Sequence, residues 1–138
     1  MTLWCVDTSA WHHSTDSLVL ARFRQALEAD EIGICDQVRL EILYSARSAA
    51  DYADLSRELA GLLPIPMGAG VFSRALQVQD ALAHAGGLHH RSVKIADLLI
   101  AAAAEQAGAV VWHYDADFDR IAAVTRQPAE WIAPRGSL

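Results

Sequence analysis

Four acidic residues lie in or beside apolar stretches of this chain: Asp7, Glu41, Asp97 and Asp115. A carboxylate is costly to bury unless a cation or hydrogen bonds compensate its charge. Because each of the four adjoins core-forming sequence, we expect one shared cation to neutralise them. Ligand sets made only of oxygen suit a hard divalent metal, so the sequence predicts a site for Mg²⁺, with Mn²⁺ as the alternative.

Three of these residues also have a purely structural explanation. Asp7 is suited to capping a helix, Asp97 to opening a buried helix, and Asp115 to starting a turn. Glu41 is harder to explain in this way, because it lies at the edge of an apolar helix face with no arginine one turn away. Glu41 therefore favours the metal interpretation most.

The elements expected around these residues place them at one edge of a sheet. Strands and helices alternate along the chain, which indicates a three-layer α/β/α fold with a mainly parallel sheet. In such folds the ligand site lies beyond the carboxyl ends of the strands. Asp7 and Asp115 end two expected strands. Asp97 opens an expected helix and Glu41 lies in the first turns of another, so all four are expected at that edge.

The expected boundaries follow from caps, glycines and prolines along the sequence. Strands are expected at residues 3–7, 31–35, 64–67, 109–114 and 130–133, the third at the sheet edge because it holds two prolines. Helices are expected through residue 11 with Ser9 as cap, then at 14–29, 37–48 with Asp36 as cap, 51–63, 70–85, 97–107 and 117–124. Residues 88–96 are expected to form a loop. No repeat or linker divides the 138 residues, which favours one domain over residues 1–138.

Two further acids follow Asp115 closely, namely Asp117 and Asp119. Both have a structural explanation, because acidic residues stabilise a helix N-terminus. Asp117 is the better candidate for an additional metal ligand, since Phe118 anchors the segment and Asp119 is expected to point away.

The net charge of −6 disfavours broad, nonspecific nucleic-acid binding, which depends on neutralising phosphates. It does not exclude a nuclease whose acidic centre is offset by metal. The densest positive cluster lies just before Asp97 and consists of His89, His90, Arg91 and Lys94. We interpret this cluster as a phosphate-contacting lip beside the acidic centre, and a solvated loop is the alternative.

Several other classes of protein are disfavoured. No uncharged apolar stretch reaches 18 residues, so no membrane-spanning helix is expected. The N-terminus lacks the basic start and long apolar run of a signal peptide, which favours a cytoplasmic protein. Cys5 and Cys35 lie in apolar, strand-like runs without C-x-x-C spacing, so we expect two buried thiols rather than a disulfide or a metal pair.

Four segments of the chain resemble motifs of the PIN-domain family and, within it, of the VapC-type toxins of bacterial toxin–antitoxin pairs. They are residues 6–11, 39–43, 97–104 and 115–121, and in this order they span almost the whole chain. The resemblance implies a PIN-like fold and an Mg²⁺-dependent endoribonuclease. It matches Asp7, Glu41, Asp97 and Asp115 to the acidic quartet of the family, Asp117 to its accessory acid, and Ser9 to a hydroxyl that orients the first aspartate.

The resemblance also implies RNA as the substrate, a homodimer, and a cognate VapB-like antitoxin that blocks the site. Carboxylate-held metal ions activate water and stabilise charge at a phosphodiester, so no nucleophilic side chain is needed.

The apolar faces of the helices expected within 16–29 and 51–63 are a candidate groove for an antitoxin helix, with Leu55 and Leu59 as positions to test.

Two other functions remain open. A phosphatase or phosphotransferase would use Asp7 as a nucleophile, but such sites commonly carry a second acid two residues on, where this chain has Ser9. A non-catalytic module would bind RNA or a protein partner without cleavage. The complete acidic quartet argues against that alternative.

Overall fold

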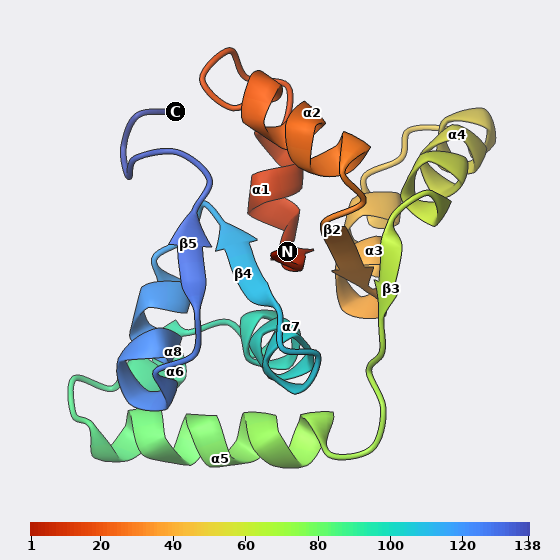
Figure 1. The fold of residues 1–138 in the computed structure, drawn as a ribbon. Coiled ribbons are helices and arrows are strands. Elements are labelled where there is room, and N and C mark those ends of the chain that lie inside the picture. Colours follow the sequence, from red (N-terminus) through yellow and green to blue (C-terminus); the bar gives the residue numbers. More distant parts are fainter.

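The computed structural model describes residues 1–138. They form a five-stranded sheet with helices on both sides (Figure 1). The strand order is β3-β2-β1-β4-β5, and every neighbouring pair is parallel, which confirms the expected sheet type. The strands are β1 (Trp4–Val6), β2 (Ile32–Cys35), β3 (Leu63–Ile65), β4 (Val110–His113) and β5 (Ala129–Trp131). As its proline predicts, β3 lies at an edge.

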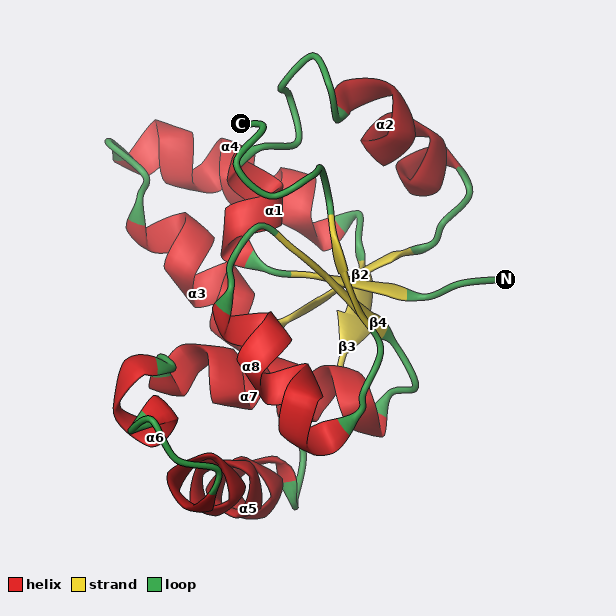
Figure 2. Cartoon of the chain, turned by 90° about the vertical axis from the view of Figure 1, so that its left-hand side faces the viewer, coloured by secondary structure: helices red, strands yellow, loops and turns green.

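Eight helices connect and cover the strands: α1 (Thr8–His12), α2 (Leu20–Glu28), α3 (Asp36–Tyr44), α4 (Ala49–Ala60), α5 (Val71–His84), α6 (His89–Ser92), α7 (Ile95–Gln106) and α8 (Asp117–Thr125). Two perpendicular views show α2 on one side of the sheet and α5, α7 and α8 on the other (Figures 1 and 2). This is the three-layer α/β/α arrangement expected from the sequence. None of the helices combines the length and hydrophobicity needed to span a lipid bilayer.

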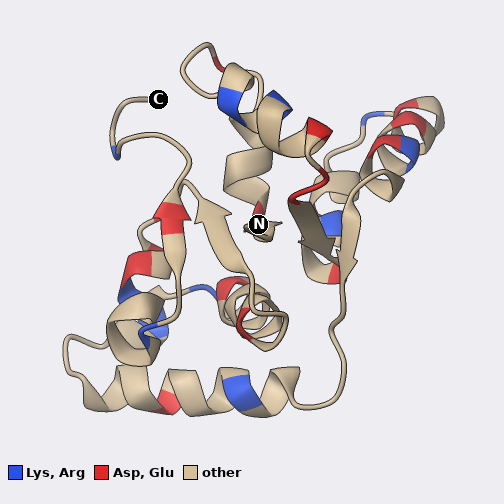
Figure 3. Ribbon diagram, in the orientation of Figure 1, with Lys and Arg blue, Asp and Glu red and all other residues tan.

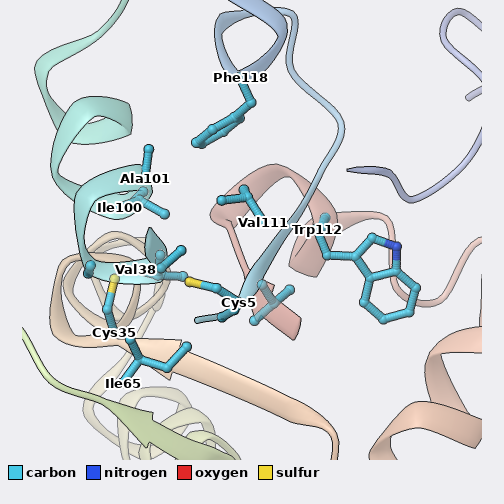
Figure 4. Packing of buried hydrophobic residues seen from close by; sticks show 14 of the residues in the cluster. Cys5, Cys35, Val38, Ile65, Ile100, Ala101, Val111, Trp112 and Phe118 are labelled. Carbon is cyan, nitrogen blue, oxygen red and sulfur yellow. The ribbon is translucent and has the colours of Figure 1, made fainter. Parts of the chain in front are cut away.

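A buried hydrophobic core of 33 residues joins the layers. The helix α7 lies at its centre, and residues 97–104 of this helix are all buried. Its run of alanines lets neighbouring elements approach closely, as dense interior packing requires. Figure 4 shows Ile100 and Ala101 of this helix near Cys5 and Cys35 in the core. Both cysteines are buried and free, as expected.

The helix expected to begin near residue 14 starts later, at Leu20. Residues 13–19 instead form consecutive turns, closed in part by a 2.9 Å backbone hydrogen bond to the carbonyl of Asp16. The side chain of Asp16 lies 2.6 Å from Nδ1 of His13 in the same segment. Short polar side chains that bond within their own turn compete with helix formation, which explains the shorter helix.

Two other local expectations were wrong. Asp36 is the first residue of α3 rather than its cap, and the cap position belongs to Cys35, which makes no side-chain capping bond. Residues 88–96, expected as a loop, contain α6 and the first residues of α7. Because α7 begins at Ile95, Asp97 lies inside its first turn rather than at its start.

Candidate metal centre

The neighbouring strands β1 and β4 bring two aspartates to the same edge of the sheet. Asp7 directly follows β1, and its backbone N–H donates to the carbonyl of Trp112 in β4 at 3.1 Å. Asp115 lies just beyond the end of β4. The carboxyl ends of parallel strands meet at one edge, so the topology alone places these two residues together.

Three carboxylates converge at this edge, and we call them the acidic triad: Asp97 in the first turn of α7, Asp115, and Asp117 at the start of α8. One oxygen from each lies within 4.8 Å of the other two. Asp97 and Asp117 are only 5% and 4% exposed. Buried carboxylate oxygens that converge in this way form a donor set suited to a hard divalent cation.

The charges of the triad are only partly compensated. Burial, together with the hydrogen bond to Asp117, raises the pKa of Asp97 to about 8, although the positive charge of Lys94 opposes the shift. The Oδ2 atom of Asp97 is buried and has no hydrogen-bond partner. Its nearest cation, Nζ of Lys94, is 3.5 Å away. A buried oxygen without a hydrogen bond is costly, and a bound cation would satisfy it. The residues present therefore fit a divalent metal ion.

Asp7 lies beside the triad and is 3% exposed. Its carboxylate accepts the N–H of Ala10 at 2.8 Å, so Asp7 is the N-cap of α1. The expectation from the sequence that Ser9 holds this position was wrong. The hydroxyl of Ser9 contacts the same carboxylate and also accepts the N–H of Tyr114 at 2.9 Å. Burial outweighs these hydrogen bonds and raises the pKa of Asp7 to about 6, with a contribution from the charge of Asp115.

Glu41 does not belong to the acidic triad, whose three oxygens lie within 4.8 Å of one another. It is half-buried on α3 and lines a shallow pocket with Thr8, Leu40 and Tyr44. Its Oε1 and the Oγ1 of Thr8 are both buried without a hydrogen-bond partner. Glu41 therefore lies beside Thr8, the residue that follows Asp7, and has one buried oxygen without a hydrogen-bond partner.

Asp117, which the sequence suggests as an additional ligand, belongs to the triad, whereas Glu41 does not. The carboxylate of Asp115 accepts the backbone N–H of Asp117 at 2.9 Å, and Phe118 is 1% exposed. These two contacts fix the start of α8 so that Asp117 faces the site. Asp119 faces away, as expected, and its carboxylate accepts the indole N–H of Trp131 at 3.0 Å.

The basic segment before α7 divides into two parts. The ammonium group of Lys94 points into the triad, 2.8 Å from Asp115 and 3.0 Å from Asp117. Arg91 is exposed and the two histidines of α6 are half-buried. Figure 3 shows the other basic positions scattered over several elements rather than gathered in one stripe. The segment at 89–94 therefore holds both a cation within the site and basic groups beside it.

Comparisons of the sequence with known proteins show to which family the chain belongs. Residues 4–124 match the PIN domain. Ribonuclease VapC18 of Mycobacterium tuberculosis is 65% identical over 136 residues, which cover 99% of each chain. Ribonuclease VapC21 of the same organism is 40% identical over 137 residues, or 99% of this chain and 98% of that protein. The chain therefore belongs to the PIN-domain family and, within it, to the VapC ribonucleases.

Solved structures share the fold. DNA-bound VapBC from Salmonella typhimurium matches with a TM-score of 0.77 at 20% identity, over 96% of this chain and 100% of that chain. VapBC2 from Rickettsia felis, bound to a fragment of its promoter, matches with a TM-score of 0.74 at 17% identity, over 94% and 98% of the two chains. At these identities the likeness supports the fold alone.

Proposed function

We propose that this protein is a metal-dependent endoribonuclease toxin that a VapB-like antitoxin neutralises. The observation that carries the proposal is the convergence of three mostly buried aspartates, one with a buried oxygen that accepts no hydrogen bond, at the carboxyl edge of the sheet. The names of its relatives, which are ribonucleases, support the same reaction.

Mg²⁺ or Mn²⁺ is the proposed cofactor, held by Asp97, Asp115 and Asp117. We propose that Asp7, which directly follows β1, and Glu41, on α3, complete the metal site. A divalent ion so held supplies an activated water and stabilises the charge that develops at a phosphodiester. No side-chain nucleophile is required.

The remaining residues of the site orient the carboxylates and the RNA. Ser9 fixes the orientation of Asp7 through its hydroxyl group, which contacts both carboxylate oxygens. Arg91, His89 and His90 lie on the short helix that precedes the triad, and we propose that they contact phosphates of the RNA. An arginine suits this role because its guanidinium can donate two hydrogen bonds to one phosphate.

The proposed antitoxin site is an apolar groove between α2 and the end of α4. It is lined in part by Trp11, Leu20, Phe23, Leu27 and Leu62. Leu20 and Leu27 are 36% and 42% exposed, so a partner helix can reach them. Leu59, a position suggested by the sequence, is fully buried, and Leu55 packs against the core. Substitutions at these two positions would therefore report on folding rather than on binding.

A homodimer is proposed through an exposed apolar patch on α5 and α7. Phe72, Leu76 and Ile95 are 70%, 66% and 69% exposed and line one shallow groove. Exposed apolar groups that adjoin one another mark surfaces where proteins associate. A second copy of the chain would cover this patch.

The test is cleavage of total cellular RNA by the purified protein with Mg²⁺, with Mn²⁺ and with EDTA. We expect discrete fragments with 5′-phosphate and 3′-hydroxyl ends that form only with metal. RNA binding without metal-dependent cleavage would contradict the proposal and favour a non-catalytic module. A phosphoaspartate trapped on Asp7 by a phosphate analogue would instead favour a phosphotransferase.

A further inference from the structure

Lys94 is the only lysine in the chain, and its ammonium group lies among the carboxylates of the acidic triad. Its Nζ atom is 2.8 Å from Oδ2 of Asp115, 3.0 Å from Oδ2 of Asp117 and 3.5 Å from Oδ2 of Asp97. One cation therefore faces all three members of the triad. This placement differs from the RNA-contacting role that the sequence suggests for Lys94.

The backbone of Lys94 is held in place, whereas its side chain reaches the triad from solvent. The backbone N–H donates to Oδ2 of Asp117 at 3.0 Å, and the residue has an extended conformation at the N-cap of α7. The side chain is 61% exposed. A lysine ammonium sits on a flexible four-carbon stem, so it can leave the triad without disturbing the fold.

The other cations near the triad compensate it less. Arg120 lies 3.4 Å from Oδ1 of Asp117, which is not the oxygen that Lys94 contacts. Arg91, on the same segment as Lys94, is exposed and forms no ion pair with any carboxylate. Lys94 is therefore the principal positive charge inside the acidic site.

We infer that Lys94 is an internal counter-ion of the acidic triad, which a divalent cation must displace in order to bind. The inference rests on the proposed metal-dependent function. Lys94 and a metal ion compete for the same oxygens, and their like charges repel at short range. Lys94 thus keeps the three carboxylates together before the metal arrives and weakens the affinity of the site for the metal. Lys94 is a positioning residue, because it acts through the carboxylates.

The presence of a single lysine makes the displacement observable in the unmodified protein. In protein labelled with ¹³C,¹⁵N-lysine, all labelled side-chain signals come from Lys94. We expect titration with Mg²⁺ to shift the ε-methylene and ammonium signals of Lys94. In a second sample, labelled uniformly with ¹⁵N, the backbone amide signals of Asp97 and Asp115 should saturate at the same Mg²⁺ concentration. Amide signals that shift while those of Lys94 stay fixed would overturn the inference alone. A protein in which no signal responds to Mg²⁺ would overturn the proposed metal site as well.

A pair of matched variants tests the competition quantitatively. Lys94→Gln and Arg91→Gln remove the same charge from the same segment, but only the first removes contacts with the triad. We expect calorimetry with Mn²⁺ to show about three- to tenfold tighter binding by Lys94→Gln, a range typical of a few exposed ion pairs, and no change for Arg91→Gln. Lys94→Arg should bind no more tightly than the wild type.

If Lys94 has a purely structural role, Lys94→Gln will bind Mn²⁺ as tightly as the wild type or more weakly. Either result would refute the inference that Lys94 and the metal ion compete for the triad. Circular dichroism in EDTA verifies that each variant is folded. If Lys94→Gln does not fold without metal, the titration of labelled wild-type protein decides the question.

Discussion

The hydroxyl group of Ser9 lies 2.7 and 2.8 Å from the two carboxylate oxygens of Asp7. The same oxygen accepts the backbone N–H of Tyr114, so one side chain links the end of β1 to the end of β4. Because Asp7 is buried, the orientation of its carboxylate depends on these contacts and on the N–H of Ala10. Ser9 therefore supports the acidic site without belonging to the triad.

Ser9→Ala is expected to slow metal-dependent RNA cleavage about 10- to 100-fold, the range typical when a residue that orients a metal ligand is lost. The variant frees the Asp7 carboxylate to turn and leaves the N–H of Tyr114 without its acceptor. Cleavage rates corrected for an EDTA blank measure the effect, and Ser9→Thr, which retains a hydroxyl, is the control. Equal rates for Ser9→Ala and the wild type would show that Asp7 needs no such support.

Asp97 is expected to make the metal-free protein less stable as the pH rises. Burial and the contact with Asp117 raise its pKa from 3.8 to about 8. Between these values the folded state holds a proton that the unfolded state has released. This group therefore lowers the free energy of unfolding from about pH 4 to about pH 8, by about 1 kcal/mol per pH unit. Urea unfolding in EDTA at several pH values measures the trend.

Asp97→Asn isolates this contribution, because it removes the titrating group from the same position. The stability of the wild type relative to Asp97→Asn should fall with rising pH and level off above about pH 8. Asp119→Asn, whose carboxylate bonds to Trp131 outside the triad, should follow the wild type. A difference between the wild type and Asp97→Asn that is constant with pH would be incompatible with the raised pKa.

Leu27→Glu is expected to weaken antitoxin binding at least about tenfold while RNA cleavage by the free toxin persists. Leu27 is 42% exposed in the groove between α2 and α4, so a charge there meets the apolar face of the partner rather than the core. Calorimetry with the cognate VapB-like antitoxin measures the affinity. Unchanged affinity would place the antitoxin elsewhere on the surface.

Leu76→Glu is expected to convert a dimer into a monomer. The side chain is 66% exposed beside Phe72 and Ile95, and a buried unpaired charge at a dimer interface is strongly unfavourable. Sedimentation velocity reports the oligomeric state. Leu18→Glu, at a similarly exposed leucine (65%) remote from α5, is the control and should remain dimeric. A dimer that survives Leu76→Glu would exclude the proposed surface.

The alternation of strands and helices in the sequence was sufficient to predict a parallel sheet and the sheet edge at which the acidic residues lie. Asp7 and Asp115 each follow a strand, and parallel neighbours carry their ends to one place. The capping role of Asp7 and its place beside the triad both hold, so the two interpretations of this residue were not exclusive. Patterns repeated along several residues thus predicted the parallel sheet and its edge strand β3, but not the order of the other strands.

Single contacts across the site were harder to predict. The N–H of Asp117 bonds to Asp115, which helps to bring Asp117 into the triad, whereas Glu41 lies beside Thr8 and outside the triad. The position of Lys94 three residues before Asp97 was a usable signal, because side chains so spaced meet in a helical turn. The same spacing does not distinguish this pairing from a solvated basic segment, because Lys94 also follows His89, His90 and Arg91 in the sequence.

The rate at which Asp97→Asn cleaves RNA in Mg²⁺, compared with Asp119→Asn, tests the carboxylate site most directly. Both variants neutralise one aspartate with almost no change of shape, but only Asp97 belongs to the triad. We expect cleavage by Asp97→Asn to fall at least about 100-fold, since a ligand of the metal is lost, and cleavage by Asp119→Asn to stay near that of the wild type. Equal cleavage by the two variants would mean that the acidic triad is not where the RNA is cut.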